Sequence, residues 1–311
     1  MNELMPNAAT VADLAPPPTG RVLIGVCTLN EAANIESLLT HLRMALPDAD
    51  ILIVDDNSPD GTAAIANRSA EHDARIRVDV RTARGLGGAI RHAMQAAIDG
   101  DYEWFVNLDG DFSHNPADIP RLLDAATHQT THSTKSGGRD VSSNAAATND
   151  AVTINSATNR SVTNNSANSA ASNQPADEQP TANGKPQREI DVVIGSRYVD
   201  GGSIVGWPLR RKIMSHLVNR FATLCLRLPV RDCSGSMRCY RVQKLKEAGA
   251  DNLVSNGYSV LEEILIRLKQ VKAHMIEVPI TFTDRTLGES KLTSREAIRS
   301  MGQMVKLALK Q

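Results

Sequence analysis

The sequence predicts an α/β fold in which a mostly parallel sheet is flanked by helices. Short apolar runs, such as residues 21–27 and 51–54, alternate with segments whose apolar residues recur at helical spacing. Continuous apolar strands are typical of parallel sheets, because such sheets are covered on both faces. Polar loops rich in aspartate follow several of these runs, and open α/β sheets bind ligands at the carboxyl ends of their strands.

The predicted elements alternate along the first half of the chain. Strands are expected at residues 21–27, 50–54, 76–80 and 102–106, and helices at 32–46, 63–72, 90–98 and 116–126. A glycine-rich turn at 84–89 precedes the third helix; it suits an anion, although close packing explains it equally. The second half continues with strands at 191–194 and 275–282 and helices at 207–227, 255–269 and 293–309.

Two segments fall outside this pattern. Residues 1–20 are polar and proline-rich, and residues 127–188 contain no aromatic residue, no Leu and no Met. Such segments bury too little apolar surface to offset their ordering entropy, so both are predicted to be disordered. The domain is therefore expected to span 21–292, interrupted by an insertion at 127–188 and followed by an amphipathic helix at 293–311.

Composition indicates a cytoplasmic protein of one or two domains. The chain has 311 residues and a formal net charge of −1, so no overall field attracts nucleic acid. Its four cysteines have no zinc-ligand spacing, and we expect reduced thiols. We find no signal peptide and no apolar run long enough to span a bilayer, so membrane association is expected to be peripheral, on the cytosolic face.

The most informative stretch is the pair Asp109 and Asp111, which follows the strand at 102–106. Residues two apart in an extended strand point the same way, so both carboxylates can meet one cation. Oxygen ligands suit Mg²⁺ or Mn²⁺, and Ser113 is a further candidate ligand. A polar turn explains the same residues, and it also explains His114, which we leave out of the metal shell.

Three aspartates, Asp55, Asp56 and Asp60, follow the second strand. Their position favours contact with a ligand, while the alternative is a capped helix start that uses Asp60 or Thr62. In the second half, a basic cluster at 210–212 lies near Trp207 at the start of the helix predicted over 207–227. That helix suits either anionic lipid headgroups or ordinary packing against the core.

Taken together, these motifs resemble those of the family 2 glycosyltransferases, and most closely those that mannosylate polyprenyl or dolichyl phosphate. The matching stretches cover much of residues 21–292 outside the insertion and lie at 28–35, 54–62, 85–87, 109–116, 195–198, 206–215, 232–240, 257–263, 277–280 and 284–292. The resemblance implies a GT-A (Rossmann-like) fold with a metal-dependent nucleotide-sugar site. It also implies inverting transfer from GDP-mannose to a polyprenyl or dolichyl monophosphate in a membrane.

The resemblance and the chemistry of this reaction assign roles to individual residues. The donor is expected to contact Thr28, Asn30, Glu31, Asp55, Asp56, Asp109, Gly110 and Asp111. Arg285 and Lys291 are expected on a mobile loop, where they stabilise the departing diphosphate. Arg197, Arg211 and Ser215 are expected to hold the acceptor phosphate, since guanidinium groups bind phosphate bidentately. The residues predicted to carry catalysis are Asp111, Arg197, Arg285 and Lys291.

The chain departs from the family pattern in its first loop, where Cys27 and Leu29 replace a usual Pro and Tyr. The resemblance implies that these positions line the nucleobase pocket, so a UDP-sugar donor for glucosyl or GlcNAc transfer remains an alternative. Gly110 stands where Ala is common, a change that we expect the backbone to accommodate. A non-catalytic nucleotide-sugar-binding protein is a further alternative, and a small membrane-anchoring subunit is a candidate partner.

Overall fold

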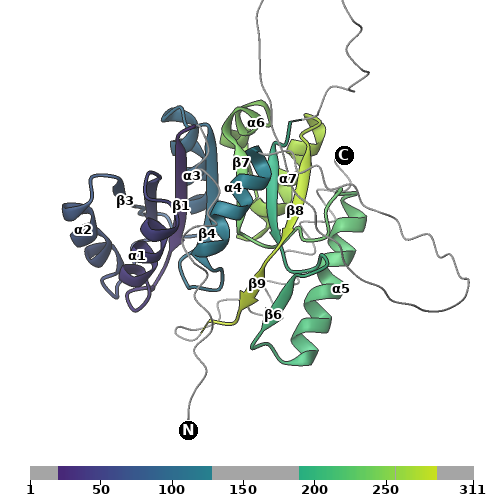
Figure 1. Cartoon of the computed structure of the whole chain (residues 1–311), viewed down its shortest axis with the longest axis horizontal. Coiled ribbons are helices and arrows are strands. Elements are labelled where there is room, and N and C mark those ends of the chain that lie inside the picture. Colours follow the sequence, from purple (N-terminus) through teal and green to yellow (C-terminus); the bar gives the residue numbers. More distant parts are fainter. Residues whose placement is uncertain (1–19, 128–188, 256, 286–311) are drawn as a thin grey trace, which may run out of the picture. The chain divides into compact units, whose positions relative to one another are not determined.

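The computed structural model describes residues 20–127, 189–255 and 257–285 (Figure 1). Within them, seven strands form one sheet in the order β3-β2-β1-β4-β7-β5-β8. The strands are β1 Val22–Thr28, β2 Asp50–Asp55, β3 Ile76–Val80, β4 Trp104–Asp109, β5 Val192–Ser196, β7 Arg238–Arg241 and β8 Met275–Pro279. All neighbouring pairs are parallel except those of β7, which runs antiparallel to β4 and β5. The predicted α/β class with a mostly parallel sheet is thus confirmed.

The register of β1 brings the predicted loops to one edge of the sheet. Cys27 lies opposite Val54 of β2 and opposite Asp109 of β4. Strand β4 was predicted to end at residue 106, but it continues to Asp109, because parallel pairing with β1 extends that far. Asp109 is therefore held by the sheet itself, and only Asp111 lies in the loop.

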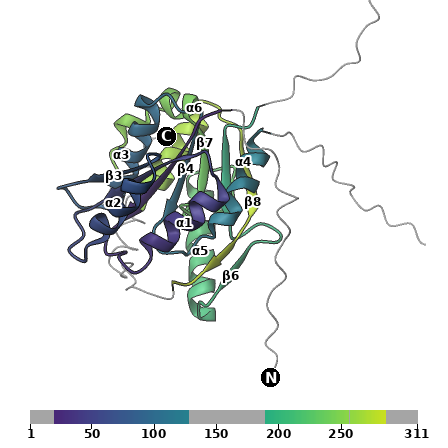
Figure 2. The same cartoon turned by 60° about the vertical axis from the view of Figure 1, so that its left-hand side comes forward.

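Helices cover both faces of the sheet (Figures 1 and 2). One apolar cluster contains side chains of α1 Ile35–Ala45 and α4 Ile119–Thr127, with a smaller share from α2 Thr62–His72. The cluster on the other face contains side chains of α3 Leu86–Asp99, α6 Val242–Glu247 and α7 Ser259–Gln270. Two short 3-10 helices are η2 Pro116–Asp118 and η3 Ala250–Asn252. Neither α6 nor β7 was predicted as a separate element with these bounds.

Two short strands, one after β5 and one after β8, form a second, two-stranded sheet. β6 Ser203–Val205 pairs in parallel with β9 Thr281–Thr283. The prediction of a single strand over 275–282 is therefore wrong, because these residues divide between two sheets at Ile280. The Ile280 N–H donates to the carbonyl of Ser196, and its carbonyl accepts from the N–H of Ser203.

Helix α5 Leu209–Cys225 follows β6 and is shorter than the predicted 207–227. Pro208 occupies the N-cap, and Arg227 adopts a φ of 50°, so the helix cannot extend in either direction. Its inner side buries Asn219 and Ala222. In the described ranges, no helix has both the length and the apolar character that crossing a bilayer requires. The predicted tail, the insertion and the last helix lie outside the described residues.

Candidate functional site

The acidic pair lies where β4 meets the following loop. Asp111 is nearly buried, and its Oδ1 accepts a 3.0 Å hydrogen bond from the backbone N–H of Ser113. Its Oδ2 lies 3.2 Å from Nη2 of Arg285. Asp109 is more open, with 27% of its side chain exposed, and its Oδ2 is 3.8 Å from Nδ1 of His114. The structure thus gathers Asp111, Ser113 and Arg285, three of the predicted residues.

The chemistry of this pair fits a divalent cation. Desolvation raises the pKa of the Asp109 carboxyl, and the neighbouring Asp111 carboxylate adds to that effect. A metal ion between the two carboxylates would remove this repulsion, and hard cations prefer oxygen ligands. Among the described residues, no group of three or more His, Cys, Asp or Glu forms a metal cage. A cation here would therefore complete its shell with water and substrate phosphate, as Mg²⁺ usually does.

His114 lies near Asp109 and packs against Phe282, the ring that also contacts the guanidinium of Arg197. Its ring is fully buried, packs edge-on against Phe282 at 5.2 Å, and neither ring nitrogen has a hydrogen bond to a described residue. Burial lowers the pKa of His114, while Asp109 acts in the opposite direction. His114 thus packs beside the acidic pair without a hydrogen bond from its ring to a described residue.

The backbone around His114 also fixes the position of Arg285. Thr283 N–H donates to the carbonyl of Ser113 at 3.0 Å, and His114 pairs with Phe282 in an isolated bridge. This pairing carries the chain from β9 to Asp111, so Arg285 reaches the acidic pair from a bonded segment. Lys291 lies outside the described residues.

Asp55 is completely buried and stabilises the loop that follows β2. Its Oδ1 accepts hydrogen bonds from Thr28 Oγ1 at 2.8 Å and Ser58 Oγ at 2.6 Å, and its Oδ2 accepts one from Ser58 N–H at 2.8 Å. Asn30 N–H donates to the same serine hydroxyl at 2.9 Å and has a positive φ of 59°. The predicted donor residues Thr28, Asn30 and Asp55 are thus joined through Ser58, which the sequence did not single out.

Asp56 connects the second loop with the glycine-rich turn. Its carboxylate accepts a 2.6 Å hydrogen bond from Gly85 N–H and forms an ion pair with Arg81. Arg81 and Gly85 precede α3, and neither was predicted to contact Asp56. The carboxylate therefore holds the start of α3 against the loop after β2.

Asp60 does not cap α2, because the N-cap is Gly61 in a left-handed conformation without a side-chain cap. Asp60 accepts instead from Thr62 N–H and from Ala32 N–H, each at 3.0 Å. Glu31 is buried in the loop that follows β1; its N–H donates to Thr62 Oγ1, and Asn34 donates to its carboxylate at 2.8 Å. The capping alternative is thus wrong for Asp60 and Thr62, which join the first two loops.

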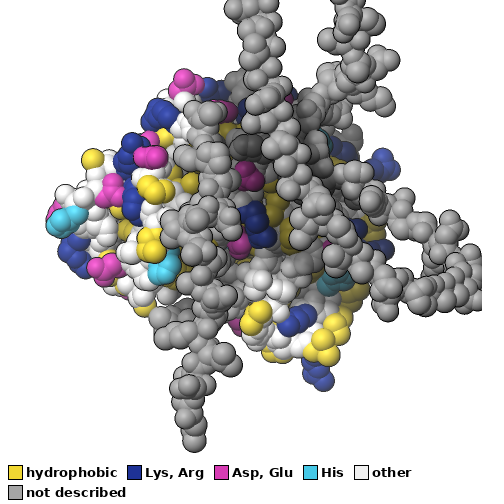
Figure 3. All heavy atoms as spheres, viewed as in Figure 1, with side chains coloured by type: hydrophobic (Ala, Val, Ile, Leu, Met, Phe, Trp, Pro, Cys, Tyr) yellow, Lys and Arg dark blue, Asp and Glu magenta, His cyan; other side chains and the backbone are white. Residues whose placement is uncertain are grey.

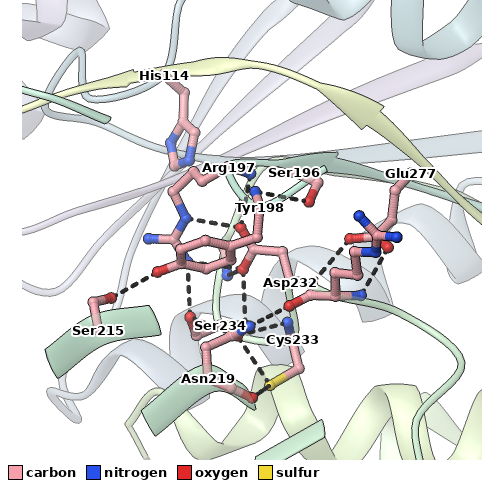
Figure 4. A network of polar contacts seen from close by, with 12 residues as sticks. His114, Ser196, Arg197, Tyr198, Ser215, Asn219, Asp232, Cys233, Ser234 and Glu277 are labelled. Carbon is pink, nitrogen blue, oxygen red and sulfur yellow. Dashed lines mark hydrogen bonds and ion pairs between the residues drawn. The ribbon is translucent and has the colours of Figure 1, made fainter. Parts of the chain in front are cut away.

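Arg197 follows β5 and forms a buried, bidentate ion pair with Asp232. Its Nε and Nη2 donate to the two oxygens of Asp232 at 2.8 Å each, and Nη2 also donates to Ser234 Oγ at 2.7 Å (Figure 4). The guanidinium lowers the pKa of Asp232 to about 2, against the opposing effect of desolvation. The sequence placed Asp232 in a family motif without a role; its position two residues before Ser234 gave no sign of this pairing.

Arg211 and Ser215 lie one turn apart on α5. Arg211 Nη1 lies 3.2 Å from both oxygens of Asp284, and its guanidinium stacks 4.0 Å from the ring centre of Trp207. Ser215 Oγ shares a 2.8 Å hydrogen bond with Tyr198 Oη, the residue after Arg197. The structure therefore brings all three predicted acceptor residues to one region but pairs each of them with a protein group.

Gly110 is closely packed against the loop that follows β1. A Cβ added there would lie 2.9 Å from Thr28 Cγ2 and 3.4 Å from Glu31 Cγ. An alanine at this position would therefore require Thr28 to move. That movement would disturb the Thr28–Asp55 hydrogen bond.

Comparisons with known proteins identify the family and the relatives of this chain. Residues 23–163 match the family described as Glycosyl transferase family 2. The chain is 31% identical over 274 residues to undecaprenyl-phosphate mannosyltransferase of Micrococcus luteus, covering 88% of each chain. It is 29% identical over 286 residues to polyprenol monophosphomannose synthase of Mycolicibacterium smegmatis, covering 91% of this chain and 85% of that protein. A crystal structure of glucosyl-3-phosphoglycerate synthase of Mycobacterium tuberculosis with Mn²⁺, UDP and phosphoglyceric acid superposes with a TM-score of 0.54 at 16% identity, covering 94% of this chain and 78% of that one.

Proposed function

This chain belongs to glycosyl transferase family 2, and we propose that it transfers mannose from GDP-mannose to a polyprenyl or dolichyl monophosphate, with inversion at the anomeric carbon. The observation that carries the proposal is the similarity, over nearly the whole chain, to two enzymes named for polyprenyl-phosphate mannose synthesis. That the chain is a glycosyltransferase follows from the family; the donor, the stereochemistry and the metal are the proposal.

The donor site would consist of the first two loops and the acidic pair. Asp109 and Asp111 would hold Mg²⁺ or Mn²⁺, which neutralises the leaving diphosphate when bound. Arg285, 3.2 Å from Asp111, would turn to the diphosphate once the metal shares that carboxylate. Lys291 is proposed to assist it. Thr28, Asn30, Glu31, Asp55, Asp56 and Gly110 would form the nucleoside side of the site, in which Asp55 and Asp56 act mainly by fixing the loops.

The acceptor phosphate would bind beside Arg197. The second pKa of a phosphate monoester is roughly 6, so its oxygen is anionic near neutral pH and needs little help from a base. Nε and Nη2 of Arg197 are held by Asp232 and Ser234, which presents Nη1 for the phosphate. Arg211 and Ser215 would add contacts by exchanging Asp284 and Tyr198 for phosphate oxygens.

We propose that α5 contacts the membrane that carries the lipid acceptor, on the cytosolic face. Six large apolar side chains on α5 are exposed: Leu209, Ile213, Met214, Leu217, Phe221 and Leu224. The helix contains four arginine or lysine residues and no acidic residue, so its charge suits an anionic surface. Apolar and basic side chains gather at the lower right of Figure 3, where Figure 1 shows α5.

Vesicle sedimentation tests this contact. Leu217→Glu should reduce binding to vesicles that contain anionic lipid, because it places a charge within the apolar surface. Val254→Glu is the matched control, since Val254 is 72% exposed and belongs to the segment between η3 and α7 instead of to α5. Equal binding by both variants would contradict the membrane contact of α5 and would favour a small anchoring subunit or the helix predicted at 293–309.

The activity is tested by transfer of radiolabelled mannose from GDP-mannose to a short polyprenyl phosphate, with Mg²⁺, with Mn²⁺ and with EDTA. We expect product that requires metal and is lost in Asp111→Asn, whereas Asp118→Asn, a carboxylate that pairs with Arg121, retains activity. Product from UDP-glucose but not from GDP-mannose would contradict the proposed donor. Nucleotide-sugar binding without transfer from either donor would contradict enzymatic function.

A further inference from the structure

Asn219 lies on the inner side of α5, one turn after Ser215, and only 4% of it is exposed. Its side chain bonds to the loop that precedes β7 instead of to its own helix. The amide Nδ2 donates to the carbonyl of Arg231. The amide oxygen accepts from Cys233 N–H at 3.0 Å. A single side chain thus uses its donor and its acceptor on the two residues that flank Asp232 (Figure 4).

Hydrogen bonds of its backbone and its side chain fix the position of Asp232 within this loop. Its N–H donates to Glu277 Oε1 at 2.9 Å, and its Oδ1 accepts from Gly235 N–H at 2.9 Å. Its carboxylate then meets the guanidinium of Arg197 with both oxygens at 2.8 Å. The position of the arginine therefore depends on where the loop holds the carboxylate.

We propose that Asn219 is a positioning residue for Arg197: it holds the Asp232 loop against α5 and thereby aims the guanidinium at the acceptor phosphate. The orientation of Arg197 toward a phosphate rests on the function proposed above, whereas the hold of Asn219 on the Asp232 loop, called the clamp below, does not. The side chain must be a neutral amide, because only an amide donates to the Arg231 carbonyl and accepts from the Cys233 N–H at this size.

Two variants separate this role from simple packing. Asn219→Ala removes the hydrogen bonds to Arg231 and Cys233, together with the longer ones that Cys233 Sγ and Ser234 Oγ donate to the amide oxygen at 3.3 and 3.4 Å. Asn219→Asp keeps the shape and the acceptor but loses the donor and adds a charge close to Asp232. A packing role predicts that the isosteric aspartate is tolerated better than alanine. The positioning role predicts the reverse at neutral pH. The affinity of Asn219→Asp for polyprenyl phosphate should then recover in part as the pH falls, because the introduced carboxyl, once protonated, would again donate to Arg231. Thr223→Ala is the control on the same helix, since the hydroxyl of Thr223 bonds, within the described part of the chain, to the carbonyl of Arg220.

The experiment measures steady-state kinetics with both substrates on the full chain. The apparent KM for polyprenyl phosphate should rise by about tenfold in Asn219→Ala, the change expected when Arg197 loses one hydrogen bond to the phosphate, while the KM for GDP-mannose stays unchanged. Equal changes in both KM values, or none, would overturn the proposal. So would an Asn219→Asp variant that matches the wild type at neutral pH.

A second measurement does not require transferase activity. The Nε–H signal of Arg197 in nuclear magnetic resonance should exchange slowly with solvent in the wild type, because that hydrogen is donated to buried Asp232. It should exchange faster in Asn219→Ala and at the wild-type rate in Thr223→Ala. If the wild type transfers no mannose, the exchange rate of this hydrogen still tests whether Asn219 holds the Asp232 loop. An unchanged rate in Asn219→Ala would overturn the proposal.

Discussion

Replacing Asp232 by Asn tests whether the buried ion pair with Arg197 is a principal stabilising contact of this domain. Both partners are almost inaccessible, with 7% and 0% of their side chains exposed. An asparagine of the same size keeps one oxygen acceptor but removes the charge. The guanidinium of Arg197 then stays in the interior without its counter-charge.

The magnitude follows from the pKa of Asp232. The pKa is about 2 in the folded chain and 3.8 for an ordinary aspartate. At about 1.4 kcal/mol per pKa unit, the difference corresponds to roughly 2 to 3 kcal/mol of stability at neutral pH. Because the folded pKa is depressed, this stability is present above pH 3.8 and is lost as the pH falls toward 2. Loss of one partner from a buried pair costs about 3–5 kcal/mol when no acceptor remains, so Asp232→Ala should be worse.

Urea unfolding at neutral pH measures the loss. The control is Glu247→Gln, which removes an exposed pair with Lys244 and should change the free energy of unfolding by less than about 1 kcal/mol. The reasoning is refuted if Asp232→Asn is as harmless as Glu247→Gln. It is also refuted if the difference between wild type and Asp232→Asn does not shrink as the pH is lowered toward 2.

Three further predictions concern other buried groups. Burial raises the pKa of Glu262 to about 7 from an ordinary 4.5, so its folded form keeps a proton that the unfolded form loses. The contribution of Glu262 to the free energy of unfolding is then fully present below pH 4.5 and falls by roughly 3 kcal/mol as the pH rises through 7. Glu262→Gln should abolish this pH dependence in urea unfolding measured at a series of pH values. Gly110→Ala should lower transferase activity and destabilise by about 1–3 kcal/mol, because Thr28 must move; full activity and an unchanged urea midpoint would contradict the tight packing. Phe105→Ala should destabilise by about 3–5 kcal/mol, because Phe105 is fully buried and stacks 6.2 Å from Tyr240; a loss below about 1 kcal/mol on calorimetry would show that the core collapses around the gap.

Much of the sheet could be predicted because its signals are local. The runs at 21–27 and 50–54 are apolar and short, and each becomes a buried parallel strand within one residue of its predicted bounds. The spacing of Ile35, Leu38 and Leu42 identified α1, and all three side chains are buried. Such elements can be predicted from neighbouring residues alone, since the period of the apolar residues differs between a helix and a strand.

Other features depend on residues far apart in the chain. Strand β7 enters the sheet between β4 and β5, which precede it by more than forty residues, and its short sequence gives no sign of antiparallel pairing. Arg197 was predicted to bind a phosphate, and its ion pair with Asp232 is invisible to any local pattern. The same is true of Arg211 and Asp284, which are 73 residues apart.

The sequence by itself determined the fold class, the acidic pair Asp109 and Asp111, and the family to which the chain belongs. These follow from periodicity and from motifs whose residues are adjacent, so no long-range contact is needed to find them. Only the tertiary structure decided how the charged groups are paired, because folding brings Asp232 and Asp284 to Arg197 and Arg211, for which the sequence predicted only a phosphate partner. Packing also decided that Gly110 has no room for a methyl group, since the distance to Thr28 exists only after β1 and β4 have paired.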